Sequence, residues 1–407
     1  MKTIILSFLM IVSVYASEKS HSYTWNAFAR QAIDASFSIK QDDAQLAIEK
    51  EKVSRSTLWK NPTFEMEFDN RFNNSVEYKY MEFSQKLPAW NENTHKKRAA
   101  EFELESKIHL KERTILQVQY EAASLFQKMK SRKRELDIVD RQLNKIEKLQ
   151  DKAISRERSG DISGLERTRI DIMKQQVAMK KYALKNSYLK IKLEAQTLLK
   201  VDHRISLRGD PVMPGERDIT WFIDSLKLSP EYRHYKAKVE ASKEALSLAE
   251  TTRYGSPELY VYSEREPIPN SSTDNFTGFG FRFSVPLWDR KDSQIEIQKV
   301  AIQKNTLRAE EVLYGLERNV RSSYALYKNI SKELKKYKKN LLEPSKKYYE
   351  VSTRSFELGE KSLLELLDAQ RVYFQNQLEY QTLILESNFY WLQLCHTASI
   401  NLLKDNK

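Results

Sequence analysis

The sequence predicts a mainly α-helical protein with a small β part, built from two tandem structural repeats. Two observations predict this fold class. Only nine glycines and ten prolines occur in 407 residues, and Lys, Arg, Asp and Glu make up 30% of the chain, which leaves room for very long helices. Two short regions of alternating apolar and polar residues interrupt the charged stretches, and such alternation is typical of strands.

The first residues, M-K-T-I-I-L-S-F-L-M-I-V-S-V-Y-A-S, combine a positive charge, an apolar run and small residues. This pattern predicts a signal peptide over residues 1–16 and a mature chain that begins near Ser17. No later stretch reaches 18 apolar residues, so no transmembrane helix is expected. The lone Cys395 excludes an intrachain disulfide. We therefore expect an exported protein.

The net charge of +12 does not indicate a nucleic-acid partner, because basic and acidic residues interleave, as in K-K-R-A-A-E-F-E-L-E-S-K at 96–107. Enzyme motifs are also missing: the chain has no Gly-rich phosphate loop, C-x-x-C or H-E-x-x-H. The six histidines are scattered, and a lone one such as His109 is expected at the surface. We expect no enzymatic activity, no cofactor and no metal site.

Landmarks that recur at nearly constant spacing predict the repeat. The spacings are 195, 198 and 199 residues for three pairs: Pro62 and Pro257, Pro88 and Pro286, Gly160 and Gly359. We expect the first repeat over 17–227 and the second over 228–407. Each reads as helix, β-hairpin, very long helix, tight turn, helix.

The hairpins are expected at about 62–87 and 257–286. T-F-E-M-E-F-D from 63 and G-F-G-F-R-F-S-V from 278 each place apolar side chains on one face. R-F-N-N-S and P-I-P-N-S-S-T-D-N carry turn chemistry. A sheet on a core and a barrel wall between lipid and water both fit this pattern. Alternation alone does not separate them.

A long helix is expected after each hairpin. In the first, apolar residues at Ile115, Val118, Ala122, Leu125 and Met129 alternate steps of three and four, which is the narrow seam of a coiled-coil-like helix. Four of the five positions 198 residues later are also apolar. Such a helix would be on the order of 100 Å long, a length that suits a wall or a stalk.

The motif G-x-x-S-x-x-E predicts a helix–turn–helix tip in each repeat, at about 159–165 and 358–364. The glycine ends one helix in the left-handed conformation, the serine caps the next, and the glutamate completes a capping box. The residues are Gly160, Ser163 and Glu166 in the first tip and Gly359, Ser362 and Glu365 in the second. The box does not explain Asp368.

One chain supplies four strands, which cannot close a barrel. Open edges in hydrocarbon would leave backbone groups unpaired, at several kcal/mol each. If the hairpins enter a membrane, at least two chains must join.

The chain resembles the TolC-type outer-membrane efflux channels over nearly all of its mature length. The segments that carry the resemblance are N-P-T-F-E-M-E-F, S-P-E-L-Y-V-Y, F-S-V-P-L-W-D-R and F-E-L-G-E-K-S-L-L-E-L-L-D-A-Q. Within this family, the segment P-L-W-D-R and the simple G-x-x-S-x-x-E motif of the tips are similar to those of the heavy-metal, CzcC-like branch. The resemblance implies a passive conduit of a tripartite efflux or secretion system. It would be a homotrimer with a 12-stranded transmembrane β-barrel in outer-membrane lipid and a periplasmic α-barrel of long helical hairpins.

The resemblance also implies roles for single residues. Glu365 and Asp368 would form acidic rings that gate the pore. Glu166 and Lys361 would form a latch between the tips, weaker with lysine than with arginine. Gly160, Ser163, Gly359 and Ser362 would lie where a periplasmic adaptor and, through it, an inner-membrane pump dock.

Pro88 and Pro286 are expected where strand becomes helix, because proline donates no ladder bond and needs no partner in a first helical turn. Trp90 and Trp288 suit a membrane–water boundary, and packing between helices explains them equally well. The main alternative is a soluble periplasmic coiled-coil structural or adaptor protein without a transmembrane barrel, extracted without detergent. The exported substrate is not readable from the sequence.

Overall fold

The computed structural model describes residues 21–70, 77–160, 162–209, 217–266 and 274–403. The expected signal peptide and the expected hairpin turns lie outside these ranges. The chain forms two compact units, which we describe separately. The helical unit comprises Met1–Ile39, Thr114–Leu226 and Gly315–Lys407, and the sheet unit comprises Lys40–Arg113 and Lys227–Tyr314. Each unit takes segments from both expected repeats, so the repeat boundaries stay a prediction.

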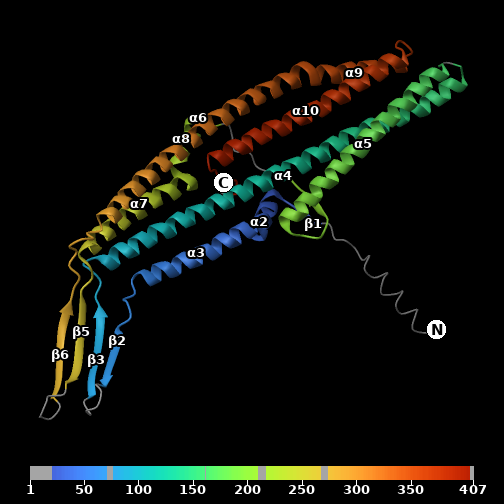
Figure 1. The fold of residues 1–407 in the computed structure, drawn as a ribbon. Helices are drawn as coiled ribbons and strands as arrows, with labels where there is room; N and C mark the ends of the chain where they lie inside the picture. Colours follow the sequence, from blue (N-terminus) through green and yellow to red (C-terminus); the bar gives the residue numbers. More distant parts are fainter. Residues whose placement is uncertain (1–20, 71–76, 161, 210–216, 267–273, 404–407) are drawn as a thin grey trace, which may run out of the picture. The chain divides into compact units, whose positions relative to one another are not determined.

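The described chain is mostly helical with a small sheet part, as predicted (Figure 1). Its α-helices are α2 (Trp25–Ala35), α3 (Phe37–Ser56), α4 (Glu92–Arg158), α5 (Gly164–Leu199), α6 (Ile219–Ser225), α7 (Pro230–Thr251), α8 (Asp292–Tyr337), α9 (Glu343–Glu357) and α10 (Leu363–Thr397). Its strands are β1 (His21–Tyr23), β2 (Thr63–Asn70), β3 (Glu77–Lys86), β4 (Ile205–Leu207), β5 (Glu258–Glu266) and β6 (Asp274–Arg282). Short 3₁₀ turns cover Leu226–Leu228 and Thr252–Tyr254.

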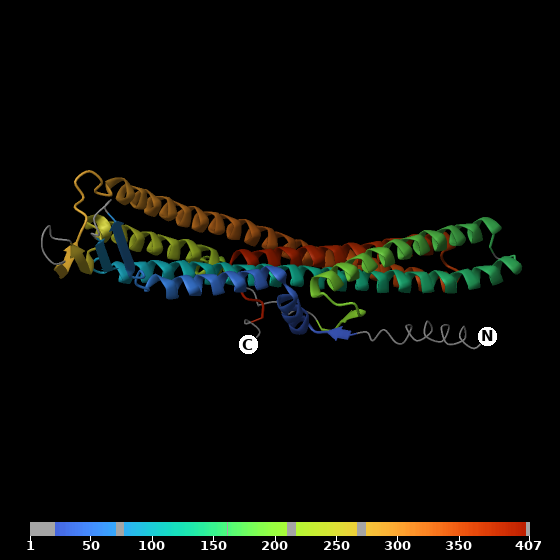
Figure 2. The same cartoon turned by 60° about the horizontal axis from the view of Figure 1, so that its bottom comes forward.

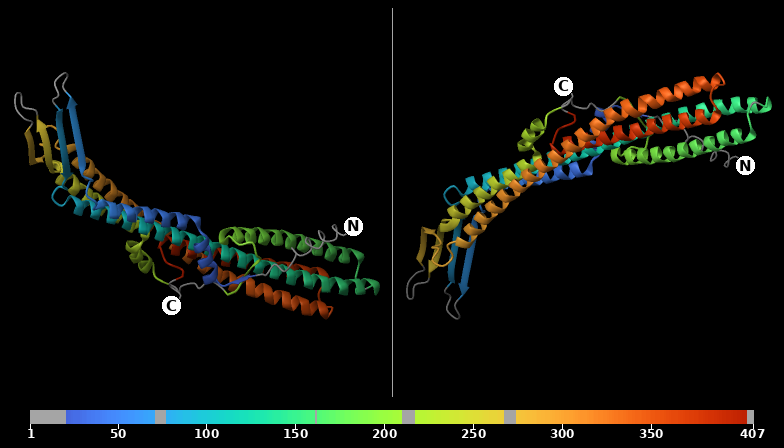
Figure 3. Two further views of the ribbon diagram at one scale, coloured as in Figure 1. Left: turned by 90° about the horizontal axis from the view of Figure 1, so that it is seen from below. Right: turned by 90° about the horizontal axis from the view of Figure 1, so that it is seen from above.

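The sheet unit contains an antiparallel four-stranded sheet in the order β2-β3-β5-β6 (Figure 3). Phe64 faces Phe83 in the first hairpin, and Tyr262 faces Gly278 in the second. The hairpins join through β3 and β5, where Phe83 lies opposite Val261. Both hairpins therefore share one sheet, so their alternating faces become two continuous faces.

In the helical unit, α4, α5, α9 and α10 run together toward two turns at the same end (Figure 2). They share an apolar core, because each helix turns one stripe inward. Its buried members are Val139, Ile146, Leu149, Ala153, Ile170, Val177, Tyr349, Phe356, Leu363, Leu366, Leu367 and Ala369. This core holds the two turns in place.

An aromatic cluster in the same unit holds α2 against α4. Trp25 and Phe28 both meet Phe126 edge to face, with ring centroids 5.9 and 5.5 Å apart. Phe222 of α6 meets Trp391 of α10 in the same way at 5.8 Å. Edge-to-face geometry is the favoured arrangement of buried aromatic rings.

The seam expected on the first long helix is confirmed. α4 has 67 residues without interruption. Val118, Ala122 and Met129 are buried, and Ile115 and Leu125 are half-buried.

The second long helix differs from the expectation, because it is not one unbroken α-helix. A π-helical turn, Lys338–Leu342, separates α8 from α9 directly before Pro344. Pro344 has no N–H to donate to the carbonyl four residues earlier. Just before the proline, the N–H of Glu343 donates to the carbonyl of Lys338, five residues earlier instead of four. This is the hydrogen-bond spacing of a π-helix.

Two other features were not predicted. β1 and β4 form a parallel pair in which His21 lies opposite Ile205; strands of three residues are too short to give a readable alternation. His109, expected at the surface, is 3% exposed. Its Nδ1 lies 3.0 Å from a carboxylate oxygen of Glu112. The expectation was wrong because it was based on residue type alone, whereas burial depends on the face of the helix on which His109 lies.

Candidate functional site

The first tip is the turn between α4 and α5. Gly160 has φ +80°, the left-handed conformation that glycine adopts at low cost. Ser163 Oγ accepts a hydrogen bond from the Glu166 N–H at 3.3 Å, and Glu166 Oε2 accepts one from the Ser163 N–H at 3.0 Å. The predicted capping box is confirmed, and Arg167 adds a 2.9 Å ion pair to Glu157 of α4.

The second tip repeats this geometry between α9 and α10. Gly359 has φ +80°, Ser362 Oγ accepts from the Glu365 N–H at 3.4 Å, and Glu365 Oε2 accepts from the Ser362 N–H at 2.9 Å. Hydrogen bonds from the backbone and hydroxyl of Ser362 hold the pKa of Glu365 below its usual range. Each serine cap contributes about 1 kcal/mol.

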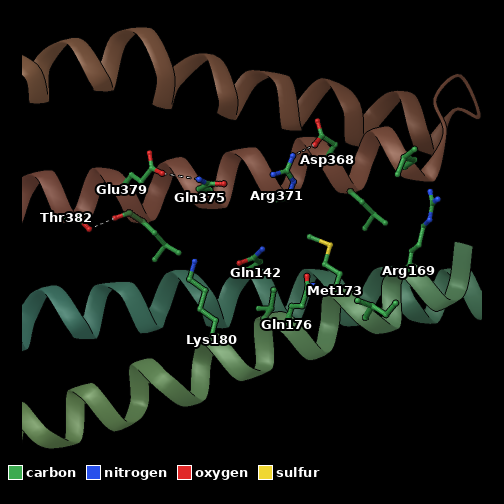
Figure 4. A pocket seen from close by; sticks show the side chains of 15 residues that line it. Gln142, Arg169, Met173, Gln176, Lys180, Asp368, Arg371, Gln375, Glu379 and Thr382 are labelled. Carbon is green, nitrogen blue, oxygen red and sulfur yellow. Dashed lines mark hydrogen bonds and ion pairs between the residues drawn. The ribbon is translucent and has the colours of Figure 1, made fainter.

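A cavity of about 620 Å³ lies behind the second tip, between α10 and the pair α4 and α5 (Figure 4). Its charged lining residues are Arg169, Lys180, Asp368, Arg371 and Glu379. Basic side chains therefore outnumber acidic ones. Met173 and several leucines supply the apolar part of the wall.

The two expected gate residues have different surroundings. Asp368 lines the cavity, and its Oδ1 lies 2.6 Å from Nη2 of Arg371 (Figure 4). Glu365 is not among the lining residues, since its carboxylate bonds to its own cap. Both carboxylates are about half exposed, at 48% and 50%. Arg371 thus partly neutralises the charge of Asp368, whereas the carboxylate of Glu365 caps the N-terminus of its own helix.

The structure does not bring the two expected latch residues together. Glu166 completes the first capping box. Lys361 Nζ lies 4.0 Å from Glu365 and 5.3 Å from the ring centroid of Tyr348. Among the described residues, no ion pair joins Glu166 to Lys361. Within one chain each residue thus belongs to its own tip.

The expected strand–helix transitions lie between β3 and α4 and between β6 and α8. Pro88 and Pro286 precede both helices and are not in a first helical turn, because the helices begin only at Glu92 and Asp292. This corrects that part of the expectation. Trp90 and Trp288 are 88% and 93% exposed, so none of the described helices packs over them.

Two features of these transitions were missed. The residue before each helix, Asn91 and Lys291, has φ +62° and +57°. Asparagine favours this left-handed region, whereas lysine gives no such signal. Glu92 is buried and accepts hydrogen bonds from Lys96, the Ala89 N–H and Ser256. Burial raises the pKa of Glu92, but these bonds outweigh it, and the pKa lies below its usual range.

The sheet has one apolar and one polar face. The apolar side chains are 38–81% exposed: Phe64, Met66, Phe68, Met81, Phe83, Leu259, Val261, Phe279 and Phe281. On the opposite face Glu82 is 2% exposed. Its carboxylate accepts hydrogen bonds from Tyr80 at 2.5 Å and from Arg282 at 3.1 Å. Within this chain, then, the polar face is the more covered one, the reverse of a sheet that packs on an apolar core.

Within the described ranges, no helix is both long and apolar enough to cross a membrane. The same part of the chain holds no cluster of three or more His, Cys, Asp or Glu side chains with the geometry of a metal site.

Residues 224–385 match the family model described as outer membrane efflux protein. A comparison with curated protein sequences finds no match.

Solved structures are similar over nearly the whole chain. CusC, whose structures concern folding and transmembrane channel formation, has a TM-score of 0.75 at 11% identity and covers 93% of this chain and 92% of its own. The open-state MtrE outer membrane channel of Neisseria gonorrhoeae has a TM-score of 0.73 at 12% identity, with coverages of 94% and 90%. The outer membrane protein VceC of Vibrio cholerae has 0.71 at 12%, with 93% and 96%. This chain therefore has the fold of these outer-membrane proteins.

Proposed function

We propose that this protein is the outer-membrane channel component of a tripartite efflux or secretion system. It is a passive conduit from periplasm to exterior and does no chemistry. The family model over residues 224–385 and the shared fold support this proposal. So does the N-terminal signal pattern, which implies export and cleavage near Ser17.

The observation that carries the proposal is the sheet. Its exposed face is a band of large apolar side chains such as Phe64, Val261 and Phe279, and its other face carries Glu, Tyr and Arg. A contiguous apolar surface of this kind marks a site of contact with lipid or protein. Lipid outside and water inside is the arrangement of a barrel wall.

The sheet edges point to the assembly. In the described chain β2 pairs only with β3, and β6 only with β5. Unpaired edges in lipid are costly, so neighbouring copies must complete the sheet. Three copies would give a 12-stranded barrel, and their helical units a periplasmic tunnel. The tips, with Gly160, Ser163, Gly359 and Ser362, would contact the adaptor that links the channel to an inner-membrane pump.

The tips would also carry the gate. Three copies of Asp368 and Glu365 would place six carboxylates around a narrowed pore and repel one another. Lys361, beside Glu365 in the same chain, would pair with Glu166 only across a contact between copies. The heavy-metal, CzcC-like branch is the variant that the P-L-W-D-R transition favours.

The test uses one substitution on both faces of β6. Arginine at the middle of a lipid-facing strand costs about 2–4 kcal/mol, whereas lumen positions tolerate it. Phe279 lies opposite Val261 on the apolar face, and Phe276 lies opposite Glu264 on the polar face. F279R is expected to prevent stable insertion, and F276R to leave it intact. The readouts are recovery of the full chain in the outer-membrane fraction, its dependence on detergent, and the mass of the extracted oligomer.

A trimer that needs detergent and forms pores in planar bilayers supports the proposal. A monomer released without detergent contradicts it and favours the soluble periplasmic alternative. If F279R and F276R reduced recovery in the outer-membrane fraction equally, or if neither reduced it, the assignment of the two faces would be contradicted.

A further inference from the structure

Two glycines of β6 lie under tyrosine rings of β5. Gly278 is opposite Tyr262, and Gly280 is opposite Tyr260. A Cβ at Gly278 would lie 2.6 Å from Cε1 of Tyr262, and one at Gly280 would lie 2.5 Å from Cζ of Tyr260. Non-bonded carbons do not approach so closely. Each ring therefore occupies the space that the Cβ of any other residue would fill.

The burial pattern of β6 agrees with this packing. Gly278 and Gly280 are half-buried, while the other seven residues of the strand are exposed. A glycine has no side chain with which to cover itself, so the neighbouring rings cover both positions. Aromatic residues across from strand glycines are a known means of stabilising such pairs.

Neighbours on the polar face restrict where the rings could otherwise go. Tyr80 stacks beside Tyr262, with centroids 6.0 Å apart, and Tyr260 lies 6.2 Å away on the other side. The Arg282 guanidinium lies 4.9 Å from the Tyr260 centroid and donates to Glu82 and Glu258. These neighbours take up space beside the rings, so turning away from the sheet is the more open path for a displaced ring.

We propose that Gly278 and Gly280 set the bore of the lumen within the sheet, apart from the gate at the tips, by letting Tyr262 and Tyr260 lie against the wall. This inference rests on the proposed function, in which the polar face lines the lumen. A side chain at either glycine lifts a ring into the lumen, three times in a trimer. The clash involves the far end of a flexible side chain, so the sheet survives and the ring moves.

The experiment compares single-channel conductance of purified full-length protein in planar bilayers. G278A/G280A is expected to lower conductance by roughly 1.5- to 2-fold, because pore-lining bulk controls the flow of ions. G278A/Y262A and G280A/Y260A, which remove the displaced ring, are expected to regain at least the wild-type value. G315A is the control, since nothing lies within 4 Å of a Cβ at Gly315 on α8.

Conducting wild-type pores together with unchanged conductance in G278A/G280A would overturn the inference alone. A fall that removal of the rings does not rescue would overturn it too, because the rings would then not be the obstruction. Absence of pores in the wild-type protein would overturn the proposed function itself, and this inference with it. If the double variant assembles poorly, the single variants G278A and G280A give the same comparison with one ring displaced in each chain.

Discussion

The two tips have the same turn and different surroundings. Gly160 and Gly359 share a φ of +80°, and both tips close the same serine–glutamate capping box. Nine residues after the glycine, however, the first tip has Arg169 and the second has Asp368. Both side chains line the same cavity (Figure 4).

The difference teaches that the repeated motif builds the turn, and that the residues outside it set the charge. The first tip is tied to α4 by the ion pair of Arg167 with Glu157. In the second, Asp368 pairs with Arg371 on its own helix. A gating role that distinguishes the second tip from the first must therefore depend on positions outside the motif, such as Asp368.

Removal of charge at the second tip is expected to have the largest effect. In E365Q/D368N, glutamine retains the capping geometry while both carboxylate charges are lost. We expect higher single-channel conductance and block by trivalent cations weakened by roughly tenfold or more, because the pore loses carboxylate charges that attract the blocking ion. Titration of the blocking ion in planar bilayers measures this.

The matched control is E166Q at the first tip. It removes the carboxylate of the first capping box, where the position equivalent to Asp368 is Arg169. It is expected to leave block by trivalent cations unchanged, because Glu166 is assigned to the latch and not to the acidic pore ring. The same response from both tips, or from neither, would remove the gate assignment of Glu365 and Asp368.

Loss of the turn glycines comes next in size. G160A and G359A each force alanine into the left-handed conformation, which costs roughly 1–2 kcal/mol. No atom lies within 4 Å of a Cβ at either site, so conformation is the only cost and the two effects should be equal. Hydrogen exchange of tip amides measures the loss of local stability.

G315A is the control again, because helix interiors prefer alanine to glycine by up to about 1 kcal/mol. Unequal losses at Gly160 and Gly359 would mean that the two turns are not equivalent.

Acid is expected to produce the smallest effect. The pKa of Glu365 is depressed in the folded protein because its carboxylate accepts hydrogen bonds from Ser362. The stability that this bond contributes is fully present above the usual carboxyl pKa and is lost as pH falls through the lowered pKa. Exchange protection of the Ser362 amide, corrected for intrinsic rates, should fall over that range.

E365Q has no charge to lose there, so its protection should not change with pH. Wild-type protection that also stays constant under acid would show that the Glu365 carboxylate does not hold this turn.

Much of the fold was predictable because its turns, helix faces and strand faces depend on the spacing of residues close together in the sequence. The capping boxes join residues three apart, and the seam through Val118 and Met129 follows helical periodicity. Hairpin alternation likewise depends on neighbours two residues apart. The π-turn before Pro344 was not predicted, because a proline inside a helix can be accommodated by a kink, a break or a π-turn, and residue type does not say which.

The sequence alone determined the turns, the helix stripes and the alternation of the strands, because these depend on residues within a few positions of each other. Only the tertiary structure decided that both hairpins share one sheet, that Arg169 and Asp368 line one cavity, and that Tyr262 lies over Gly278. Those contacts join residues far apart in the chain, where packing, and not local spacing, selects the neighbours.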